Sequence, residues 1–505
     1  MRKNQNFEYG RQGRALPGKT RLKQLSLVVF LTVAAVSGLM GCAAVGPDYK
    51  PAEIAMDTAW HSETAKGLTR QGTPSDTAQW WDNFNDPVLS ELIAKAMENN
   101  LDLKEAKARI REARAQKGVT RAQGLPAVDG TGALSRSGSS QEGRGAATNY
   151  TTGFDASWEL DVFGGVRRSV EASEANLRMS VEDLGDVMVS LLAETALNYI
   201  DARTLQKRLA VAKADLESRQ ETWDLLRLQY DAGLIAELDV VQARTSLESA
   251  RSKIPALQTS LDAALNRIAV LLGQRPGQLH AMLDSQSPIP VSSTDLAVGV
   301  PADTLRNRPD IRMAEQEVAL RTAQVGVAMA DLYPKFTLLG AIGLESLSAK
   351  DFLTAPTRTW SLGPSFSWKI FDAGAVRQTI EVQSALQEQA LIQYQSSILA
   401  ALEEVENALF AYARELELKK TLTDGMEAAD QALKLAQDQY TSGLGDFSDV
   451  LEARRSLLTF ENDLAQSRGT LASDLVRLYK VLGGGWTNSI PLTEEPLTHH
   501  ESYKG

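Results

Sequence analysis

The sequence has little of the chemistry that catalytic and metal sites require. It contains one cysteine and four histidines among 505 residues. A single cysteine excludes a disulfide framework and any zinc site built from cysteines. The chain also has no Gly-rich phosphate loop ending in Lys-Ser/Thr, no His-Glu-x-x-His motif and no hydrolase-like arrangement of Ser and His. The histidines are scattered, as His61, His280, His499 and His500. We therefore expect no catalytic, cofactor-binding or metal-binding residues, and a protein that is not an enzyme.

Aromatic residues and long apolar runs are also scarce. Aromatic residues make up 6% of the chain, and 64 acidic against 53 basic residues give a net charge of −11. This acidic balance argues against nucleic acid as the main partner. After residue 41, no run of about 18 apolar residues is found, so we expect no helix of the mature chain to span a bilayer. If the mature chain spans a membrane, it does so as strands.

The N-terminus has the pattern of an export signal. Residues 1–41 carry seven basic residues and one acidic residue, and their apolar run at 25–39 has secretory length but is too short to span. Leu39-Met-Gly-Cys42 resembles a bacterial lipobox, in which the cysteine takes a diacylglycerol and becomes the mature N-terminus. The absence of an Asp beside Cys42 then implies sorting to the outer membrane. A buried cysteine after a membrane anchor is the alternative.

The two halves of the chain repeat one another. Gln229-Tyr-Asp-Ala-Gly-Leu234 reappears as Gln439-Tyr-Thr-Ser-Gly-Leu444, at an offset of 210 residues. Further upstream the offset is 208, as between Gly118 and Gly326. So constant a spacing indicates a tandem duplication.

Each half contains a segment in which apolar and polar residues alternate. Weaker, Gly-rich partners precede these segments at 128–136 and 336–345. Strands of about ten residues with one apolar face suit a transmembrane barrel wall, with lipid outside and water inside. A soluble sheet with one wet face alternates in the same way. The apolar positions are Phe154, Ala156, Trp158, Leu160 and Val162 in the first half, and Trp360, Leu362, Phe366, Trp368 and Ile370 in the second.

Four strands are too few to close a membrane barrel. Known barrels begin at about eight strands, and an open edge in lipid would leave backbone groups unpaired. If these strands span, each chain must therefore donate its four strands to an oligomer. Two chains would give about eight strands and three about twelve, and the strand pattern alone does not choose between them.

Long helices are expected after the strands. Segments 166–230 and 376–440 each cover 65 residues without a proline, about 100 Å if continuous. In both halves apolar residues recur at alternating steps of three and four, which is typical of a coiled-coil seam. Pro255 lies within the first seam, so we expect a kink or local break there. The seam residues are Leu247, Ala250, Ile254, Leu257, Leu261, Ala264, Ile268 and Leu271, and then Ile398, Leu402, Val405, Leu409 and Tyr412.

Each long helix reverses direction at a Gly-Leu pair, Gly233-Leu234 in the first half and Gly443-Leu444 in the second. Glycine suits the left-handed position that ends a helix, and the leucine beside it would be exposed at the tip. An exposed apolar side chain at the end of a coiled coil favours a docking site. In the alternative, the leucine packs back onto its own helices.

Together these motifs resemble the TolC family of outer-membrane factors, specifically the NodT/OprM-type lipoprotein branch. The resemblance covers nearly all of the mature chain, and the order and spacing of its motifs are specific. The motifs are Gly46-Pro-Asp-Tyr-Lys-Pro51, Trp80-Trp81, Asn99-Asn-Leu-Asp-Leu103, Trp158-Glu-Leu-Asp-Val-Phe-Gly-Gly165, Ala193-Glu-Thr-Ala-Leu-Asn-Tyr199, Arg308-Pro-Asp-Ile311 and Glu403-Glu-Val-Glu-Asn-Ala-Leu409.

The resemblance implies a mixed α and transmembrane β fold, with two tandem repeats of long coiled-coil helices and two strands each. Three chains would form a 12-stranded β-barrel in the outer membrane, continued by an α-helical tunnel in the periplasm. Such a homotrimer is the outer-membrane channel of a tripartite RND-type efflux system, and it passively conducts small molecules or drugs. The implied partners are a periplasmic adaptor (membrane fusion) protein, docking at the Gly-Leu turns, and an inner-membrane transporter. Lipid on Cys42 would anchor each chain in the outer membrane.

The expected organisation follows from the repeats and the export signal. It is a signal peptide at 1–41, an extended N-terminal segment at 42–88, a first repeat at 89–290 with strands at 127–137 and 151–163, a second repeat at 291–485 with strands at 335–346 and 359–372, and a C-terminal tail at 486–505.

The resemblance also implies a periplasmic aperture. Asp449 and Glu452 lie three residues apart and so share a helix face. They match the acidic constriction of the family, where three copies would form rings of like charge; a solvated helix face is the alternative. Tyr440 matches a tyrosine that bridges neighbouring coils to an aspartate, here Asp239. The companion arginine of the family falls at Gly445, so that second restraint is missing.

Three other functions are weighed against small-molecule efflux. A duct for protein secretion is disfavoured by the lipobox and the NodT-like motifs. Metal-ion efflux has little support, because the ten methionines are dispersed and form no ladder. A coiled-coil lipoprotein without a pore would explain Cys42 and the seams, but not the duplicated strands.

Overall fold

The computed structural model describes residues 44–51, 60–61, 68–69, 78–138, 146–285, 287–292, 296–297 and 305–486. Cys42, the predicted signal peptide and the tail after residue 486 lie outside the described residues. The chain divides into two units. The sheet unit comprises residues 1–48, 119–171 and 322–384, and the helical unit comprises residues 49–118, 172–321 and 385–505.

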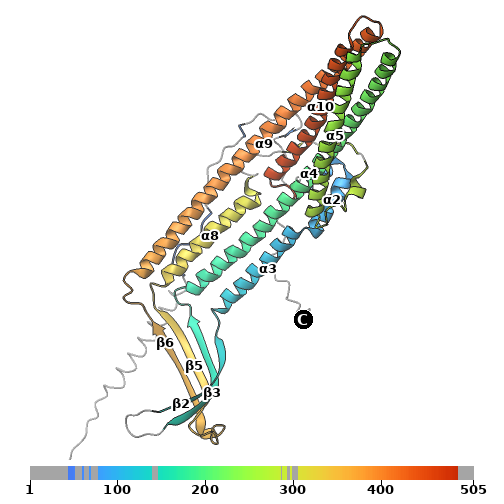
Figure 1. Cartoon of the computed structure of the whole chain (residues 1–505). Helices are drawn as coiled ribbons and strands as arrows, with labels where there is room; N and C mark the ends of the chain where they lie inside the picture. Colours follow the sequence, from blue (N-terminus) through green and yellow to red (C-terminus); the bar gives the residue numbers. More distant parts are fainter. Residues whose placement is uncertain are drawn as a thin grey trace, which may run out of the picture. The chain divides into compact units, whose positions relative to one another are not determined.

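Helices account for most of the described chain, and the division between the units passes through four of them (Figure 1). The helices are α2 (Pro87–Asn99), α3 (Leu101–Ala122), α4 (Gly165–Asp231), α5 (Glu237–Leu271), α6 (His280–Leu283), α8 (Pro309–Ala330), α9 (Ala375–Thr441) and α10 (Phe447–Val481), with short 3-10 helices η2 (Trp80–Phe84) and η3 (Ala355–Thr357). The strands are β1 (Leu68–Thr69), β2 (Ala127–Ser137), β3 (Ala147–Leu160), β4 (Leu296–Ala297), β5 (Lys335–Ser346) and β6 (Arg358–Ser367).

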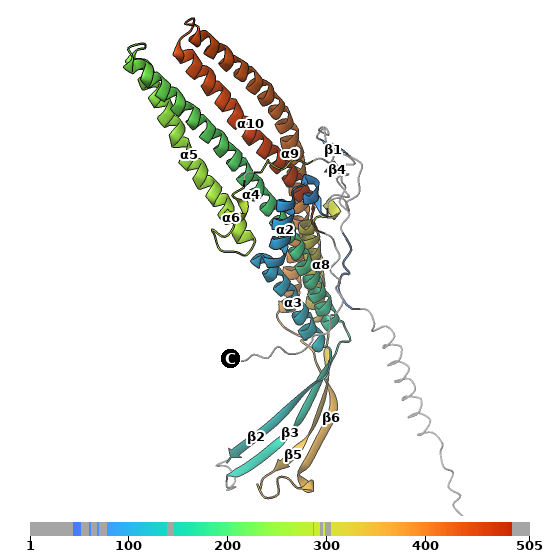
Figure 2. The same cartoon turned by 90° about the vertical axis from the view of Figure 1, so that its right-hand side faces the viewer.

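The sheet unit is built on four antiparallel strands in the order β2-β3-β5-β6 (Figures 1 and 2). Paired residues lie on the same face of an antiparallel sheet. Phe154 pairs with Ile342 and Ile342 with Trp360, and these side chains are 62%, 65% and 80% exposed. The neighbouring set on the other face is Asp155, Ala341 and Ser361. The sheet therefore has an exposed apolar face and a more polar face, as the alternation predicts.

The strand bounds differ from the sequence-based ones only at the ends. β2 and β5 coincide with segments 127–137 and 335–346, whereas β3 begins at Ala147 and β6 ends at Ser367. The earlier start of β3 falls in a polar stretch with no alternation to mark it. In the sheet as described, β2 and β6 each pair along one side only.

The long helices match their predicted bounds to within one residue. α4 and α9 each contain 67 residues, and α5 and α10 each contain 35. Of the kink or local break expected at Pro255, the break does not occur, since α5 continues through it, and the kink stays a prediction. Pro255 is exposed, so water can satisfy the carbonyl that its missing N–H leaves unpaired. None of the described helices is both long and apolar enough to cross a bilayer.

The core of the helical unit lies where the coiled-coil seams meet the N-terminal helices. Ile268 of α5 and Val405 of α9 are fully buried in it, as the seam pattern predicts. Trp80 of η2 is also buried and stacks on Tyr479 of α10, with 5.1 Å between ring centroids. Burial of a Trp against a Tyr contributes apolar area and a favourable ring contact. These contacts fix the segment before α2 to the C-terminal helix.

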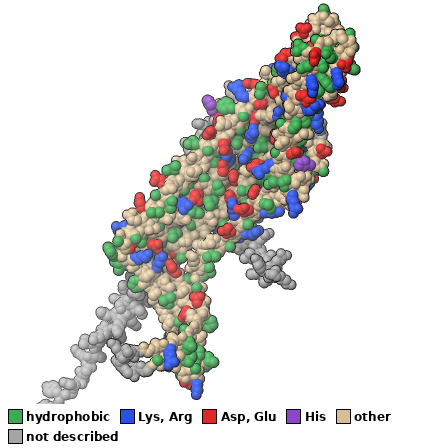
Figure 3. Space-filling view, in the orientation of Figure 1, with side chains coloured by type: hydrophobic (Ala, Val, Ile, Leu, Met, Phe, Trp, Pro, Cys, Tyr) green, Lys and Arg blue, Asp and Glu red, His purple; other side chains and the backbone are tan. Residues whose placement is uncertain are grey.

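A polar network also ties the N-terminal helices to α4. Asp86 caps α2 by accepting from the backbone N–H of Val88, and its other oxygen accepts from the Tyr199 hydroxyl at 2.7 Å. Burial and the Asp86 carboxylate raise the pKa of Tyr199 to about 12. Arg203 completes the chain by donating to the Tyr199 oxygen at 3.1 Å. On the surface, by contrast, acidic and basic side chains are mixed over the visible face of the helices (Figure 3), and such exposed pairs stabilise little.

One ion pair in the helical unit is largely shielded from water. Glu182 of α4 accepts from Arg312 of α8 at 2.8 Å, and their side chains are 8% and 25% exposed. Burial raises the pKa of Glu182, while Arg312 opposes that rise. The guanidinium therefore offsets part of the cost of burying this carboxylate.

Replacing that cation should destabilise the helical unit. We expect Arg312→Met to cost about 3 kcal/mol at pH 7, because Glu182 would be left as an uncompensated buried charge. The pKa of Glu182 is raised in the folded state, so the penalty for its unpaired charge grows as pH rises through that pKa. The cost of Arg312→Met should therefore be smaller at pH 5 than at pH 7. Chemical unfolding of the purified protein at the two pH values measures this. Equal costs at both values would contradict it.

Candidate functional site

At both helical tips the Gly-Leu turn is closed by backbone hydrogen bonds. In the first, Gly233 N–H donates to Tyr230 O at 2.8 Å and Leu234 N–H donates to Gln229 O at 2.9 Å. Gly233 has φ of 75°, the left-handed conformation that glycine adopts without strain. The second tip repeats this geometry, with φ of 71° at Gly443. The duplication has therefore conserved the turn type in both halves.

The leucine beside each glycine projects into solvent. Leu234 is 74% exposed and Leu444 is 81% exposed. The alternative in which these leucines pack back onto their helices is therefore wrong for this chain. Each tip thus presents an exposed leucine beside its glycine turn, and adaptor docking there remains a prediction.

A small apolar cluster joins the two hairpins, α4–α5 and α9–α10, near their tips (Figure 2). This tip cluster comprises the buried residues Leu226, Ala243, Phe447 and Val450. Tyr440 packs against Phe447, with 5.5 Å between ring centroids. A cavity of about 360 Å³ lies beside the cluster, lined by residues of all four helices. The hairpins thus meet through few apolar contacts.

The structure brings the predicted pair Tyr440 and Asp239 close together without joining them. Burial and the nearby Asp239 carboxylate raise the pKa of the Tyr440 hydroxyl. Within the described chain, no hydrogen bond links the two side chains. Any bridge by Tyr440 therefore requires either a small movement or a neighbouring chain.

The acidic pair has local partners that the sequence analysis overlooked. Asp449 accepts from the backbone N–H of Asp446 at 3.4 Å, which caps the start of α10. Glu452 pairs with Arg455 at 3.1 Å, and both side chains remain largely exposed, at 69% and 73%. The basic residue three positions after Glu452 was visible in the sequence. Asp449 and Glu452 nevertheless stay on the surface of a single chain.

Polar links below the tips were also missed. Arg454 of α10 donates to Ser218 of α4, and Arg208 of α4 donates to Asn462 of α10 at 2.8 Å. Burial lowers the pKa of Arg454, against the effect of nearby Asp215. The residues of each hydrogen-bonded pair lie more than 230 positions apart in the sequence, so no local motif predicts these contacts. They connect the first hairpin, α4–α5, to the second, α9–α10.

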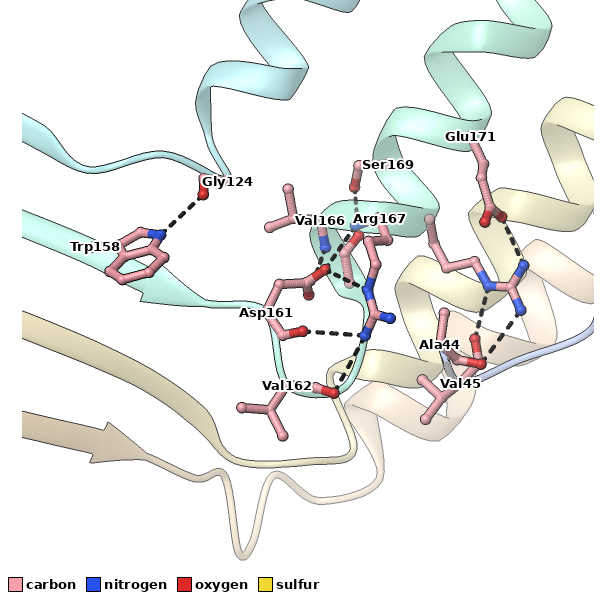
Figure 4. Close-up of polar contacts among 12 residues, drawn as sticks. Ala44, Val45, Gly124, Trp158, Asp161, Val162, Val166, Arg167, Ser169 and Glu171 are labelled. Atoms are coloured by element: carbon pink, nitrogen blue, oxygen red, sulfur yellow. Dashed lines mark hydrogen bonds and ion pairs between the residues drawn. The ribbon is translucent and has the colours of Figure 1, made fainter. Parts of the chain in front are cut away.

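The sheet unit has its own polar junction, where β3 leads into α4 (Figure 4). Asp161 accepts from the backbone N–H groups of Val166 at 3.0 Å and Arg167 at 2.9 Å, which caps α4. Beside it, the Trp158 indole donates to Gly124 O at 2.9 Å and leaves its ring 37% exposed.

The repeat copy has the same tryptophan contact. Trp368 donates to Leu332 O at 3.0 Å, and its side chain is 52% exposed. A satisfied N–H with an exposed ring is typical of tryptophan at a membrane–water interface. Among the residues that the structure describes, no group of three or more His, Cys, Asp or Glu side chains is arranged to hold a metal ion.

Comparison with known proteins agrees with this architecture. Residues 92–274 and 300–484, one segment in each half, match the family model of the outer membrane efflux protein. The chain is 34% identical to nodulation protein T of Rhizobium leguminosarum bv. trifolii, over 88% of this chain and 94% of that protein. It is 30% identical to the toluene efflux pump outer membrane protein TtgF of Pseudomonas putida, over 93% and 98%.

The fold is also that of a solved channel. The outer-membrane channel OprN superposes with a TM-score of 0.82 at 36% identity, covering 88% of this chain and all of that one. The match extends over both repeats, so the resemblance to NodT/OprM-type proteins is confirmed. The family is one of membrane channels and not of enzymes. By fold, by duplicated segments and by sequence, this chain belongs to the outer membrane efflux protein family.

Proposed function

We propose that this chain is one third of an exit duct. Three copies would form a homotrimer, with a 12-stranded β-barrel in the outer membrane and an α-helical tunnel below it. The single observation that carries this proposal is the four-stranded sheet, with one apolar face and two edges that no other described residue pairs with. In hydrocarbon each edge must pair, and copies of the same sheet are the simplest partners.

The duct would serve a tripartite RND-type efflux system. Its partners would be an inner-membrane transporter and a periplasmic adaptor that contacts the exposed Leu234 and Leu444 at the Gly233 and Gly443 turns. Relatives described as outer-membrane components of toluene and solvent pumps support small molecules as the cargo, rather than proteins or metal ions. A water-filled passage has little chemistry for selecting among them, so selection would lie with the transporter.

The remaining sequence-based assignments complete the proposal. Residues 1–41 would be removed as a signal peptide, and lipid on Cys42 would hold the chain in the outer membrane. The tips would form the aperture, with Tyr440 and Asp239 restraining it. Asp449 and Glu452, repeated three times, would line it with negative charge.

Conductance of the purified, full-length mature protein tests the duct. In a planar lipid bilayer we expect an ion-conducting oligomer that resists dissociation in unheated detergent samples. Tyr440→Phe removes the hydroxyl nearest Asp239 and should increase conductance, since the aperture loses a restraint. A stable monomer without conductance would overturn the proposed function. A conducting oligomer that Tyr440→Phe leaves unchanged would reject only the role of Tyr440.

Divalent-cation block tests the acidic aperture. The double variant Asp449→Ala with Glu452→Ala should need roughly tenfold more divalent cation for half block, since a factor of ten corresponds to about 1.4 kcal/mol of lost attraction. Glu417→Ala, an exposed acidic change elsewhere on α9, serves as the control. Block at the same concentration in all three proteins would refute the assignment.

Substitution of the tip leucines tests docking. Leu234→Asp with Leu444→Asp should abolish cross-linking to the adaptor in cells, because a charge replaces each exposed apolar contact. The turns are closed by backbone bonds, so the purified variant should still assemble into the oligomer that resists dissociation in unheated detergent samples. Undiminished cross-linking would remove the tips from the docking surface.

A further inference from the structure

The segment that follows Cys42 is bound by a single buried arginine. Residues 44–48, here called the strap, lie against the start of α4 in the sheet unit (Figure 4). Arg168 donates to Val45 O at 3.0 Å, to Gly46 O at 3.1 Å and to the Asp48 carboxylate at 2.7 Å. Its remaining terminal nitrogen donates to Glu171 at 2.7 Å. The Arg168 side chain is only 4% exposed, so the strap supplies most of the groups that satisfy this cation.

The backbone around Arg168 is shaped to admit the strap. Val45 N–H donates to Phe163 O at 3.1 Å, as in a short strand pairing. A Cβ placed on Gly164, which has φ of 83°, would lie 2.5 Å from the Cβ of Ala44. A Cβ on Gly46 would lie 2.5 Å from the Cα of Gly326 in α8. Such close approach is possible only with glycine at these positions.

The duplication provides an internal comparison for this site. At the offset of 210, Arg168 corresponds to Gln378 and Gly164 to Gly374. Gln378 is exposed, and within the described chain nothing lies within 4 Å of a Cβ built on Gly374. The first repeat therefore has an arginine, with the strap packed against Gly164. The second repeat has a glutamine at the equivalent position, and no described residue packs against Gly374. The strap site is an addition to the repeated scaffold, not a requirement of it.

The strap begins close to Cys42 in the sequence, since only Ala43 separates Cys42 from Ala44. The strap is held beside the junction of β3 and α4, where Trp158 donates to Gly124 O. Tryptophan is enriched at membrane–water interfaces. A strap docked at this junction would therefore suit a lipid attached near such an interface.

We propose that Arg168 is the docking group for the N-terminal strap and ties the lipid-bearing end of the chain to the sheet unit, in place of a free tether. This rests on the proposed function in one respect, namely that Cys42 carries lipid. Arg168 acts here as a positioning residue. The groups that it binds are backbone carbonyls and one carboxylate of the strap, and it holds them only in the folded sheet unit.

Amide hydrogen exchange of the strap tests this proposal, with the full-length mature protein in lipid nanodiscs and mass spectrometry of the peptide that contains Val45. We expect the Val45 amide to be protected in the unchanged protein. Arg168→Gln, which installs the residue that the second repeat already carries, should speed its exchange by about tenfold or more, as expected when a hydrogen bond to a charged group is lost. Arg168→Lys, with one ammonium for several acceptors, should give an intermediate rate.

Two further variants separate docking from general damage. Gly46→Ala keeps Arg168 but blocks the close approach to Gly326, and it should also speed exchange at Val45. Arg178→Gln, an exposed arginine on the same helix, should leave Val45 protected. Exchange in the α4 core should be unchanged in all variants. An unprotected Val45 in the unchanged protein, or protection that survives both Arg168→Gln and Gly46→Ala, would overturn the docking role.

The mass of the N-terminal peptide distinguishes the two proposals. Acyl chains on Cys42 together with a protected Val45 support both. If Cys42 carries no lipid while Val45 is protected, the lipid anchor of the proposed function fails and so does the anchoring half of this inference, whereas Arg168 still binds the strap. If Cys42 is lipidated but Val45 is unprotected, the lipid anchor stands and the docking by Arg168 is rejected.

Discussion

The pairing of backbone groups along the sheet governs the rest of this structure. Four strands hydrogen-bond in the order β2-β3-β5-β6, which leaves one side of β2 and one side of β6 unpaired within the part of the chain that the structure describes. In water an open edge is tolerable, but in hydrocarbon each unpaired group costs several kcal/mol. An apolar face with Trp360 and Phe366 exposed at 80% and 70% is equally unsuited to water. Both features fit the proposed assembly, in which lipid covers the apolar face and further copies of the chain pair with the edges.

Sequence periodicity was sufficient to predict the helices and strands that a local pattern of residues defines. The bounds of α4 and α9 were predictable because neither contains proline and each ends at a Gly-Leu pair. The alternation that includes Trp158 and the one that leads up to Trp368 marked β3 and β6, because strand alternation is also a local pattern. The helix is not broken at Pro255 because, although proline removes one hydrogen bond wherever it occurs, the cost depends on burial, and this proline is exposed.

The candidate site was predictable only in part. Exposed leucines at the tips follow from the turn type, which needs no long-range contact. The links from Arg454 to Ser218 and from Arg168 to the strap join residues 236 and about 120 positions apart, so no window of sequence contains both partners. Glu452 illustrates a further limit, because its charge was noticed while its neutralising neighbour Arg455 was not. The duplication helps here, because the two repeats can be compared position by position. Where they differ, as at Arg168 and Gln378, the residue has a role in one repeat only.

The closure of the Gly-Leu turns by backbone hydrogen bonds has an evolutionary consequence. Because Gly233 and Gly443 complete their turns with main-chain hydrogen bonds, the exposed side chains of Leu234 and Leu444 are not needed to close them. Selection can therefore change the side chains at 234 and 444 with little effect on the turns, and it can change them independently in the two halves. In such a scaffold the shape of the tip does not depend on the side chains that a partner would contact. Related channels can therefore diverge in the partners that they recognise while the hairpins keep the same fold.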